Sequence, residues 1–600
     1  MTRLRSFLPI PRPLPGTLAV ALCGLFAAPA LAAPTSQVVT IEGQPTGALT
    51  GKSVVVDPGH GLFFHDTYGW IYQRDPINGL HEDKHTNEIV MDWLRPHLEG
   101  AGARVLATRA PHRQTVNVIV DNGDPGYSET GTFTTTTNTG LGYRGSYRYA
   151  TTSRLAATAT ATWSATLPQR GDYPVWIYYY AGADRSSRAS FTVRHAGGTT
   201  RVRINQQLDR QRWIYVGTYP FVPTQPAAVT LDNFDPGAKA GEEPVIIADA
   251  VRFGVGLGDF LHDGKPSGEA RWLEESFYYM ADHGAPETVY KTRMVERDSG
   301  LVSRPLYADW EGADAFVSVH TNAADKPNVG SGMTSYIHDT MPSAGSDKLQ
   351  SAVHAELLRT NRTLYVKDFP DRGKLSANFA VVREIKTMPA ILLELAFHDT
   401  EMPDAMLLRT PSYRRDIGRA IYKGLLRYLN PGAVVTPLPP TLTEVTNLGG
   451  GSLRVRFQPE ADPLEPNATA AWYRLFVMRG ATGFGSPVEV RGATEYVMSG
   501  FAPGEVVAFQ VRAVNDGGES LPSASLSVTV DSLPVDPPPP PTDMPDLGAV
   551  ASPGPESVGG CSAAAGSPHR GTGLWFLAAA GALGSLVRRR RRWSGATGAR

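Results

Sequence analysis

Cysteine is nearly absent from this sequence. Its 600 residues include two cysteines, Cys23 and Cys561, and the first lies in a segment that we expect to be removed. The one cysteine that remains cannot form a disulfide within the mature chain. An exported protein of this length must then be held together by its hydrophobic cores or by bound metal.

Excess charge and long apolar runs are scarce as well. The formal net charge is −1, which gives no electrostatic reason to expect a nucleic acid as partner. Residues 18–28 and 574–587 are apolar, but both runs are shorter than the roughly 20 residues that a membrane-spanning helix needs. We interpret the first run as part of a signal peptide and the second as part of a processed tail. A membrane anchor is the alternative for each.

The N-terminus has the three regions of a secretory signal. Arg3 and Arg5 supply positive charge, residues 18–28 are apolar, and residues 30–32 have the small-residue pattern of a cleavage site. We therefore predict a signal peptide over residues 1–32. The mature protein is expected to be exported, to the periplasm, the cell surface or the medium.

Changes in composition predict several folded units. Residues 48–112 and 256–430 alternate strand and helix patterns, which is typical of an α/β domain. Residues 113–255 instead contain short strand-like runs, separated by turns, and nothing helical, which indicates an all-β sandwich. We predict an α/β fold with a central, mostly parallel sheet flanked by helices, interrupted by this β domain at a surface loop.

The C-terminal part adds a second β module and a tail. Residues 437–532 contain strand-like runs and form the β module. Residues 533–560 are rich in proline and glycine and predict an extended linker. Residues 561–600 hold an apolar run followed by arginines 588–592, so we expect a sorting or anchor segment that could attach the protein to a membrane.

Hydrophobic periodicity predicts the elements of the α/β domain. Residues 54–56 are β-branched and run into an Asp-Pro-Gly turn, which is typical of a buried strand with a sharp end. Ser346 is a candidate helix N-cap. The remaining predicted strands are 103–109, 313–320 and 389–394, and the predicted helices are 87–100, 269–283, 346–359 and 413–428.

Three of these strands end in residues with chemically active side chains. His60 follows the first strand, while His320 and Glu394 end two later ones. Ligands of open α/β sheets bind at the carboxyl ends of the strands, so these side chains are candidates for one site. Glu82, in the loop and helix start after the first strand, is a fourth candidate.

Two imidazoles and one carboxylate form a common ligand set for catalytic zinc. The set leaves one position open for water, and zinc lowers the pKa of that water to roughly 7 and polarises a carbonyl. A further carboxylate is then needed as general base and as proton donor to the leaving amine. Glu394 suits that role because it follows an apolar run and should have a raised pKa.

The motifs around these residues resemble those of the zinc-dependent N-acetylmuramoyl-L-alanine amidases. The resemblance covers roughly residues 50–112 and 256–430. It lies in Val-Val-Asp-Pro-Gly-His-Gly at 55–61, Glu82 before Thr-Asn at 86–87, Ser-Val-His-Thr-Asn-Ala at 318–323, Leu-Leu-Glu-Leu-Ala-Phe at 392–397, and Arg304. It implies that Zn²⁺ is held by His60, Glu82 and His320, that Glu394 is catalytic, and that the substrate is peptidoglycan. No substrate-binding residue is assigned.

The sequence also departs from that family pattern. The glycine expected after His60 and Gly61 is Leu62, and the loop over residues 63–80 is long and aromatic. The spacing after Glu82 is one residue longer than expected, so Glu88 remains an alternative ligand. Three further histidines, His65, His81 and His85, could support the site, but we expect them to be solvated.

Three other segments carry resemblances of their own. Residues 113–255 resemble the golvesin C-terminal-like domain, through motifs at 118–127, 195–198, 202–207 and 247–253. Such domains resemble carbohydrate-binding modules, and the candidate exposed aromatic residues are Tyr143, Tyr147, Tyr149, Trp176 and Trp213. Residues 437–532 resemble a fibronectin type III domain, and the segment around Cys561 resembles a MYXO-CTERM sorting tail.

These features predict an exported zinc-dependent peptidoglycan hydrolase. It would cleave the amide between N-acetylmuramic acid and the L-alanine of the stem peptide. Other surface polysaccharides are further candidate partners of the β domains. Two alternatives stay open: a catalytically inactive surface adhesin that binds polysaccharide, and a zinc hydrolase of another amide, whose substrate the aromatic loop would determine.

Overall fold

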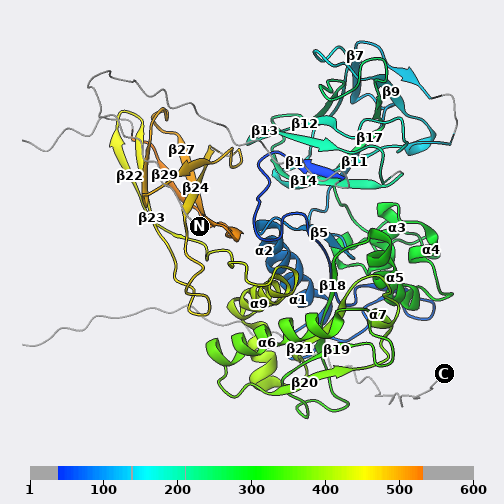
Figure 1. Cartoon of the computed structure of the whole chain (residues 1–600), viewed down its shortest axis with the longest axis vertical. Coiled ribbons are helices and arrows are strands. Elements are labelled where there is room, and N and C mark those ends of the chain that lie inside the picture. Colours follow the sequence, from blue (N-terminus) through cyan, green and yellow to red (C-terminus); the bar gives the residue numbers. More distant parts are fainter. Residues whose placement is uncertain (1–37, 137–139, 210, 481, 532–600) are drawn as a thin grey trace, which may run out of the picture. The chain divides into compact units, whose positions relative to one another are not determined.

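The computed structural model describes residues 38–136, 140–209, 211–480 and 482–531 (Figure 1). The expected signal peptide, the linker, the C-terminal segment and both cysteines lie outside these ranges. No helix within the described ranges is long and apolar enough to cross a membrane.

A six-stranded sheet forms the centre of the α/β domain. All neighbouring strands are parallel except β19 and β21, so the prediction of a mostly parallel sheet is confirmed. In spatial order the strands are β20 (Asp371–Ser376), β19 (Met333–Ile337), β21 (Ala390–Phe397), β18 (Ala315–Asn322), β2 (Ser53–Pro58) and β5 (Arg104–Ala107).

The three central strands β21, β18 and β2 are buried on both faces. Their near-continuous apolar runs suit a parallel sheet that is covered on both sides. On one face, Val54, Val317 and Ile391 pack with residues of η1 (Glu88–Leu94), α6 (Ser346–Leu364) and α9 (Pro411–Leu429).

The opposite face of the sheet has a second core. Val55, Phe316 and Leu392 pack there with residues of α3 (Ser276–His283), α5 (Glu296–Glu311) and α7 (Ala380–Arg383). The alternation of these residues with those of the first core follows from the period of two along a strand. The sheet is therefore the middle layer of three, as predicted.

The first helix begins earlier than residue 87. It starts at Glu82 and continues without interruption through α1 (Glu82–Asn87), the π-helical η1 (Glu88–Leu94) and α2 (Arg95–Gly100). The first turns are charged and polar, so apolar periodicity gave no signal for them. As a result Glu82 lies on the first residue of a helix.

Two other helix predictions need correction. The helix expected over 269–283 is shorter: a 3₁₀ turn at Arg271–Leu273 comes first, and α3 begins at Ser276. The intervening backbone pairs elsewhere, because Glu275 N–H donates to Leu62 O at 3.0 Å. Ser346 is the first residue of α6 rather than its N-cap, and its hydroxyl accepts a hydrogen bond from Ala390 N–H at 2.9 Å.

The insertion is a β-sandwich, as predicted. Its larger sheet has the order β1 (Val39–Ile41), β13 (Gly198–Ile204), β12 (Ala189–His195), β15 (Ala227–Asp232), β10 (Thr160–Ala165) and β7 (Tyr127–Thr130). The second has the order β14 (Trp213–Phe221), β11 (Gly171–Tyr178), β17 (Ala250–Gly254) and β6 (Asn117–Val120). Side chains of both sheets share one hydrophobic core.

Smaller features complete this domain. A third sheet consists of β16 (Val245–Ala248), β9 (Arg148–Thr151) and β8 (Thr134–Thr135). Strand β1 precedes the α/β domain in sequence but pairs with β13, so the insertion recruits an N-terminal strand that the sequence did not reveal. Of the five aromatic candidates for an exposed site, Tyr147, Trp176 and Trp213 are buried, which corrects that expectation for them.

The C-terminal module is also built from antiparallel strands. One sheet contains β22 (Thr441–Gly449), β23 (Ser452–Gln458) and β26 (Glu495–Met498). The other contains β25 (Val488–Val490), β24 (Trp472–Arg479), β27 (Val506–Asn515) and β28 (Gly518–Glu519), with β29 (Leu526–Thr529) also paired to β27. Residues of both sheets form a separate core, in agreement with the predicted β module.

Candidate metal centre

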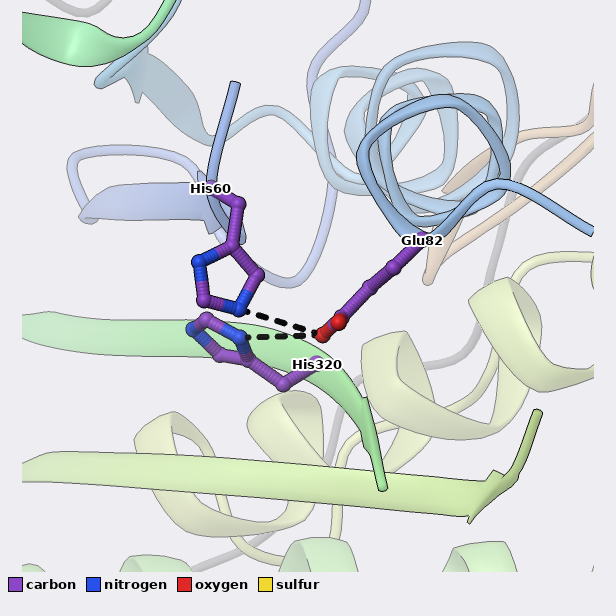
Figure 2. Close-up of side chains that lie close together, drawn as sticks. All are labelled: His60, Glu82 and His320. Carbon is purple, nitrogen blue, oxygen red and sulfur yellow. Dashed lines mark hydrogen bonds and ion pairs between the residues drawn. The ribbon is translucent and has the colours of Figure 1, made fainter. Parts of the chain in front are cut away.

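Two neighbouring strands bring His60 and His320 together. Strand β2 pairs in parallel with β18, and Val319 lies beside Pro58. His60 follows β2 by two residues, and His320 lies in β18 directly after Val319. The two imidazole rings meet edge to face with their centroids 4.7 Å apart (Figure 2).

Glu82 completes the cluster from the start of helix α1. Its Oε1 lies 3.4 Å from Nε2 of His60 and 3.3 Å from Nδ1 of His320 (Figure 2). One ligand atom from each residue lies within 4.8 Å of the others. All three residues are buried, with exposed fractions of 6%, 3% and 5% for His60, Glu82 and His320.

Two of the spacings in this cluster suit a tetrahedral zinc ion. Ligands about 2.0–2.1 Å from zinc lie about 3.3–3.4 Å from one another in that geometry. The distances of 3.3 and 3.4 Å from Glu82 Oε1 match this value. They are longer than the about 2.7–2.9 Å of a charge-assisted hydrogen bond, so the cluster resembles a ligand set more than a salt bridge.

The protonation of Glu82 fits the same interpretation. Burial alone would raise the pKa of this carboxyl, but His60 and His320 hold the pKa well below its ordinary value. A metal ligand must be deprotonated, so the carboxylate form is the one that zinc requires.

The turn that carries His60 has an uncommon backbone. His60 has φ = 60°, a left-handed conformation that costs a non-glycine residue roughly 1–2 kcal/mol. A carboxylate oxygen of Asp83 accepts a hydrogen bond from Gly61 N–H and holds the turn. Gly59 leaves room for the second imidazole, because a Cβ there would lie 2.4 Å from Nδ1 and Cε1 of His320.

Two buried arginines donate hydrogen bonds to backbone carbonyls of the same turn. Arg304 Nη2 donates to His60 O at 3.3 Å, and Arg109 Nη1 donates to Gly59 O at 3.3 Å. Arg304 was among the residues that carry the family resemblance, whereas Arg109 was seen only as the end of a predicted strand. Burial lowers the pKa of Arg109 to about 10, which still leaves it charged at neutral pH.

Glu394 lies beside the cluster on the next strand. It occupies β21 at the position paired with His320, and its side chain is half-buried. Burial, followed by the charge of Glu82, raises its pKa to about 8. Its Oε2 is buried with no hydrogen-bond partner in the part of the chain that the structure describes. Such a carboxyl can exchange a proton near neutral pH.

The alternative ligand and the nearby histidines have other contacts. Glu88 pairs with Arg414 at 2.9 Å, and the structure brings Glu82 rather than Glu88 to the two imidazoles. His85 is buried and shares a 3.0 Å hydrogen bond with Thr321, so the expectation that it is solvated was wrong. His81 forms an ion pair with Asp83 at 3.2 Å.

Sequence analysis missed two residues of the aromatic loop that reach the cluster. Oε1 of Gln73 lies 2.5 Å from Nδ1 of His60, and Nε of Arg74 lies 3.0 Å from Oε2 of Glu82. The only signal for them was the unusual length of the loop over residues 63–80.

Two family profiles match the chain. The N-acetylmuramoyl-L-alanine amidase profile matches residues 278–427, which include His320 and Glu394. The golvesin C-terminal domain profile matches residues 118–255, in agreement with the predicted insertion. His60 and Glu82 lie outside both matched segments, and it is the structure that joins them to His320.

Individual relatives match parts of the chain. The chain is 39% identical over 139 residues to the sporulation-specific N-acetylmuramoyl-L-alanine amidase of Bacillus subtilis (strain 168), over 23% of this chain and 49% of the relative. It is 33% identical over 138 residues to the xanthan lyase of Bacillus sp. (strain GL1), over 23% of this chain and 14% of the relative. The chain thus spans about half the length of the first relative and 14% of the second.

A solved structure gives a further likeness. The N-acetylmuramoyl-L-alanine amidase from Clostridium difficile 630 is 31% identical over 22% of this chain and 66% of that chain, with a TM-score of 0.20.

Proposed function

We propose that this protein is an exported, zinc-dependent N-acetylmuramoyl-L-alanine amidase. It would hydrolyse the amide between the lactyl group of muramic acid and the L-alanine of the stem peptide in peptidoglycan. The observation that carries the proposal is the convergence of His60, Glu82 and His320 beside Glu394. The amidase profile over residues 278–427 supports it.

The proposed roles follow from the contacts. His60, Glu82 and His320 would hold Zn²⁺, since two imidazoles and one carboxylate leave an open position for substrate or water. When bound, the metal supplies Lewis-acid activation of the attacking water and of the amide carbonyl. The chain's own residues must then hold the substrate, move protons and keep the ligands in place.

Glu394 would carry the proton. As a carboxylate it accepts a proton from the water that attacks the carbonyl carbon. It then delivers that proton to the amide nitrogen as the C–N bond breaks, which releases the stem peptide with a free L-alanine amine. The raised pKa of Glu394, about 8, suits a group that must both accept and donate a proton near neutral pH.

The attached domains would bring the catalytic domain to its polymer. The likeness of the insertion to the golvesin C-terminal domain, and of the chain to a xanthan lyase, supports polysaccharide binding by residues 113–255. Tyr143 and Tyr149 are the partly exposed candidates that remain there. We further propose that residues 437–532 are a fibronectin type III spacer, and that residues 1–32 and 561–600 direct export and surface display.

Two other functions remain as alternatives. A surface adhesin would have no physical need for a buried carboxylate between two imidazoles, so the cluster disfavours an inactive fold. A zinc hydrolase of another amide would use the same four residues. The aromatic loop over residues 63–80, which lies beside the cluster, is where the two hydrolases would differ.

The test measures zinc content and release of stem peptide from purified peptidoglycan. Wild type is compared with Glu394→Ala and with Glu384→Ala, a carboxylate that pairs with Arg383 instead. We expect bound zinc in all three proteins and release by wild type and Glu384→Ala only. Bound zinc without release from any wall preparation would point to another amide. A folded protein without zinc would favour the adhesin.

A further inference from the structure

The aromatic loop over residues 63–80 contacts two of the three cluster residues. It begins as a hairpin of β3 (Phe63–His65) and β4 (Gly69–Ile71), and Gln73 and Arg74 follow directly. Both residues are exposed, yet the polar end of each contacts a buried side chain of the cluster.

Gln73 contacts the nitrogen of His60 that faces away from Glu82. Nε2 of His60 points at Glu82, whereas Nδ1 lies 2.5 Å from Oε1 of Gln73. A metal ligand through Nε2 must carry its proton on Nδ1, and the amide oxygen accepts that proton. The contact therefore fixes both the tautomer and the rotation of the ring.

Arg74 contacts the carboxylate oxygen that the imidazoles leave free. Oε1 of Glu82 faces both imidazoles, and Oε2 forms a 3.0 Å ion pair with Nε of Arg74. The pair lacks the alignment of a hydrogen bond, so its effect is mainly electrostatic. It keeps Oε2 turned away from the imidazoles and favours binding through one oxygen.

The loop is anchored on both sides of the segment that carries these side chains. Phe64 N–H donates to the Tyr278 hydroxyl at 2.9 Å, and the ring of His262 stacks on Phe64 with centroids 4.3 Å apart. At the far end, Asn78 donates to His398 O at 3.1 Å. Anchors on both sides of residues 73–74 limit the freedom of the segment between them.

We propose that Gln73 and Arg74 are positioning residues of the metal centre. Gln73 fixes the ring of His60 with Nε2 directed into the site, and Arg74 restrains Glu82 to one metal-facing oxygen. The inference rests on the proposed function only in taking zinc as the metal. It assigns a role to a loop that departs from the amidase pattern.

The experiment measures zinc affinity of the purified full chain by competition with a chromophoric chelator. Gln73→Ala should weaken zinc binding by about 10–100-fold, as loss of an outer partner of a ligating histidine does. Gln73→Glu should bind zinc as tightly as wild type or more tightly, because a carboxylate also accepts from Nδ1. Asp75→Ala is the matched control, since Asp75 is an exposed neighbour with no polar contact to the cluster among the described residues.

Cobalt(II) substitution tests Arg74. Without Arg74, both oxygens of Glu82 are free to bind, so the visible absorption of cobalt should weaken in Arg74→Ala as the coordination number rises. A zinc affinity of Gln73→Ala within about twofold of wild type would overturn the role of Gln73. An unchanged cobalt spectrum in Arg74→Ala would overturn that of Arg74.

The two proposals fail in different ways. Suppose that wild type binds zinc and releases stem peptide, that Gln73→Ala has the zinc affinity of wild type, and that Arg74→Ala has its cobalt spectrum. Only the positioning roles are then wrong. If wild type binds zinc with no release and Gln73→Ala still loses affinity, the positioning role stands and the substrate is wrong.

Discussion

Two buried polar clusters in this protein differ in how their atoms are satisfied. In the insertion, Gln206 donates to Ile247 O and accepts from Ile247 N–H, both at 2.8 Å. Asn233 accepts from the N–H groups of Thr158 and Ala159 and donates to Thr151 O. Both polar atoms of each of these two buried amides are therefore hydrogen-bonded within the fold.

The cluster at the carboxyl ends of the central strands of the α/β domain is arranged differently. His60, Glu82 and His320 point toward one another, and Nε2 of His320 and Oε2 of Glu394 have no hydrogen-bond partner within the described ranges. A buried polar atom without a partner costs about 1–3 kcal/mol. Such atoms also occur elsewhere in the described residues, for example Thr152 Oγ1 in the insertion, but here they belong to two residues paired on neighbouring strands, where a ligand could offset the cost.

Removing the carboxylate of Glu82 should have the largest effect. Glu82→Gln keeps the shape of the side chain but replaces an anionic ligand by a weak neutral one. We expect zinc affinity to fall by more than the about 10–100-fold typical of outer partners, and amidase activity to disappear. Zinc content after dialysis and release of stem peptide are the measurements.

Glu88→Gln is the matched control for that change. Glu88 lies on the same helix but pairs with Arg414, so its loss should leave zinc content unchanged. Loss of zinc from Glu88→Gln, with retention in Glu82→Gln, would reverse the assignment of the ligand.

The satisfied cluster should respond in stability instead. Gln206→Leu leaves the N–H and C=O of Ile247 unpaired in the core, at about 1–3 kcal/mol for each group. Urea denaturation should show a lower free energy of unfolding, whereas zinc content should not change. If Gln206→Leu lost as much zinc as Glu82→Gln does, the two clusters would be coupled and the comparison between them would fail.

Substitutions of two glycines, one beside the metal cluster and one in the insertion, test the same comparison. Gly59→Ala would force a Cβ to within 2.4 Å of the His320 ring, and overpacking of this kind costs about 1–3 kcal/mol. We expect the ring to move and zinc binding to weaken. Gly123→Ala in the insertion is the control, because a Cβ there meets no atom within 4 Å. The same zinc affinity in both variants would argue that Gly59 has no special role.

Strand ends explain why part of the site could be predicted from sequence. His60 follows β2, whereas His320 and Glu394 lie near the carboxyl ends of β18 and β21, which continue beyond the predicted ends to Asn322 and Phe397. Parallel strands bring their carboxyl ends together. Glu82 was predicted from its motif, although the polar first turns of its helix gave no periodic signal. These residues depend on local patterns that a sequence displays.

The remaining features depend on which distant segments fold together. Gln73 and Arg74 come from a loop whose course is set by contacts with Tyr278 of α3 and with His398. The two contacts join residues 214 and 320 positions apart. The burial of His85 depends on Thr321, and strand β1 pairs with a strand of the insertion. No local pattern encodes such contacts, so sequence reasoning did not find them.

The last comparison concerns the pH dependence of stability in the metal-free protein. The pKa of Glu394 is about 8 in the folded state, above its ordinary value of 4.5. Between these values the folded protein retains a proton that the unfolded chain has lost. The free energy of unfolding should then fall as pH rises, by up to about 1.4 kcal/mol per pH unit. Below pH 4.5 both states are protonated, and above pH 8 the full penalty is present.

Glu394→Gln should remove this contribution and flatten the curve. Urea denaturation with a chelator present, at several pH values from 5 to 8.5, gives the difference between wild type and variant. Other carboxyls with a raised pKa, such as Glu274, Glu275 and Asp249, are common to both proteins and cancel in that difference. The variant should gain stability relative to wild type as pH rises. A constant difference would mean that Glu394 is ionised throughout and therefore well solvated, like an ordinary surface carboxylate.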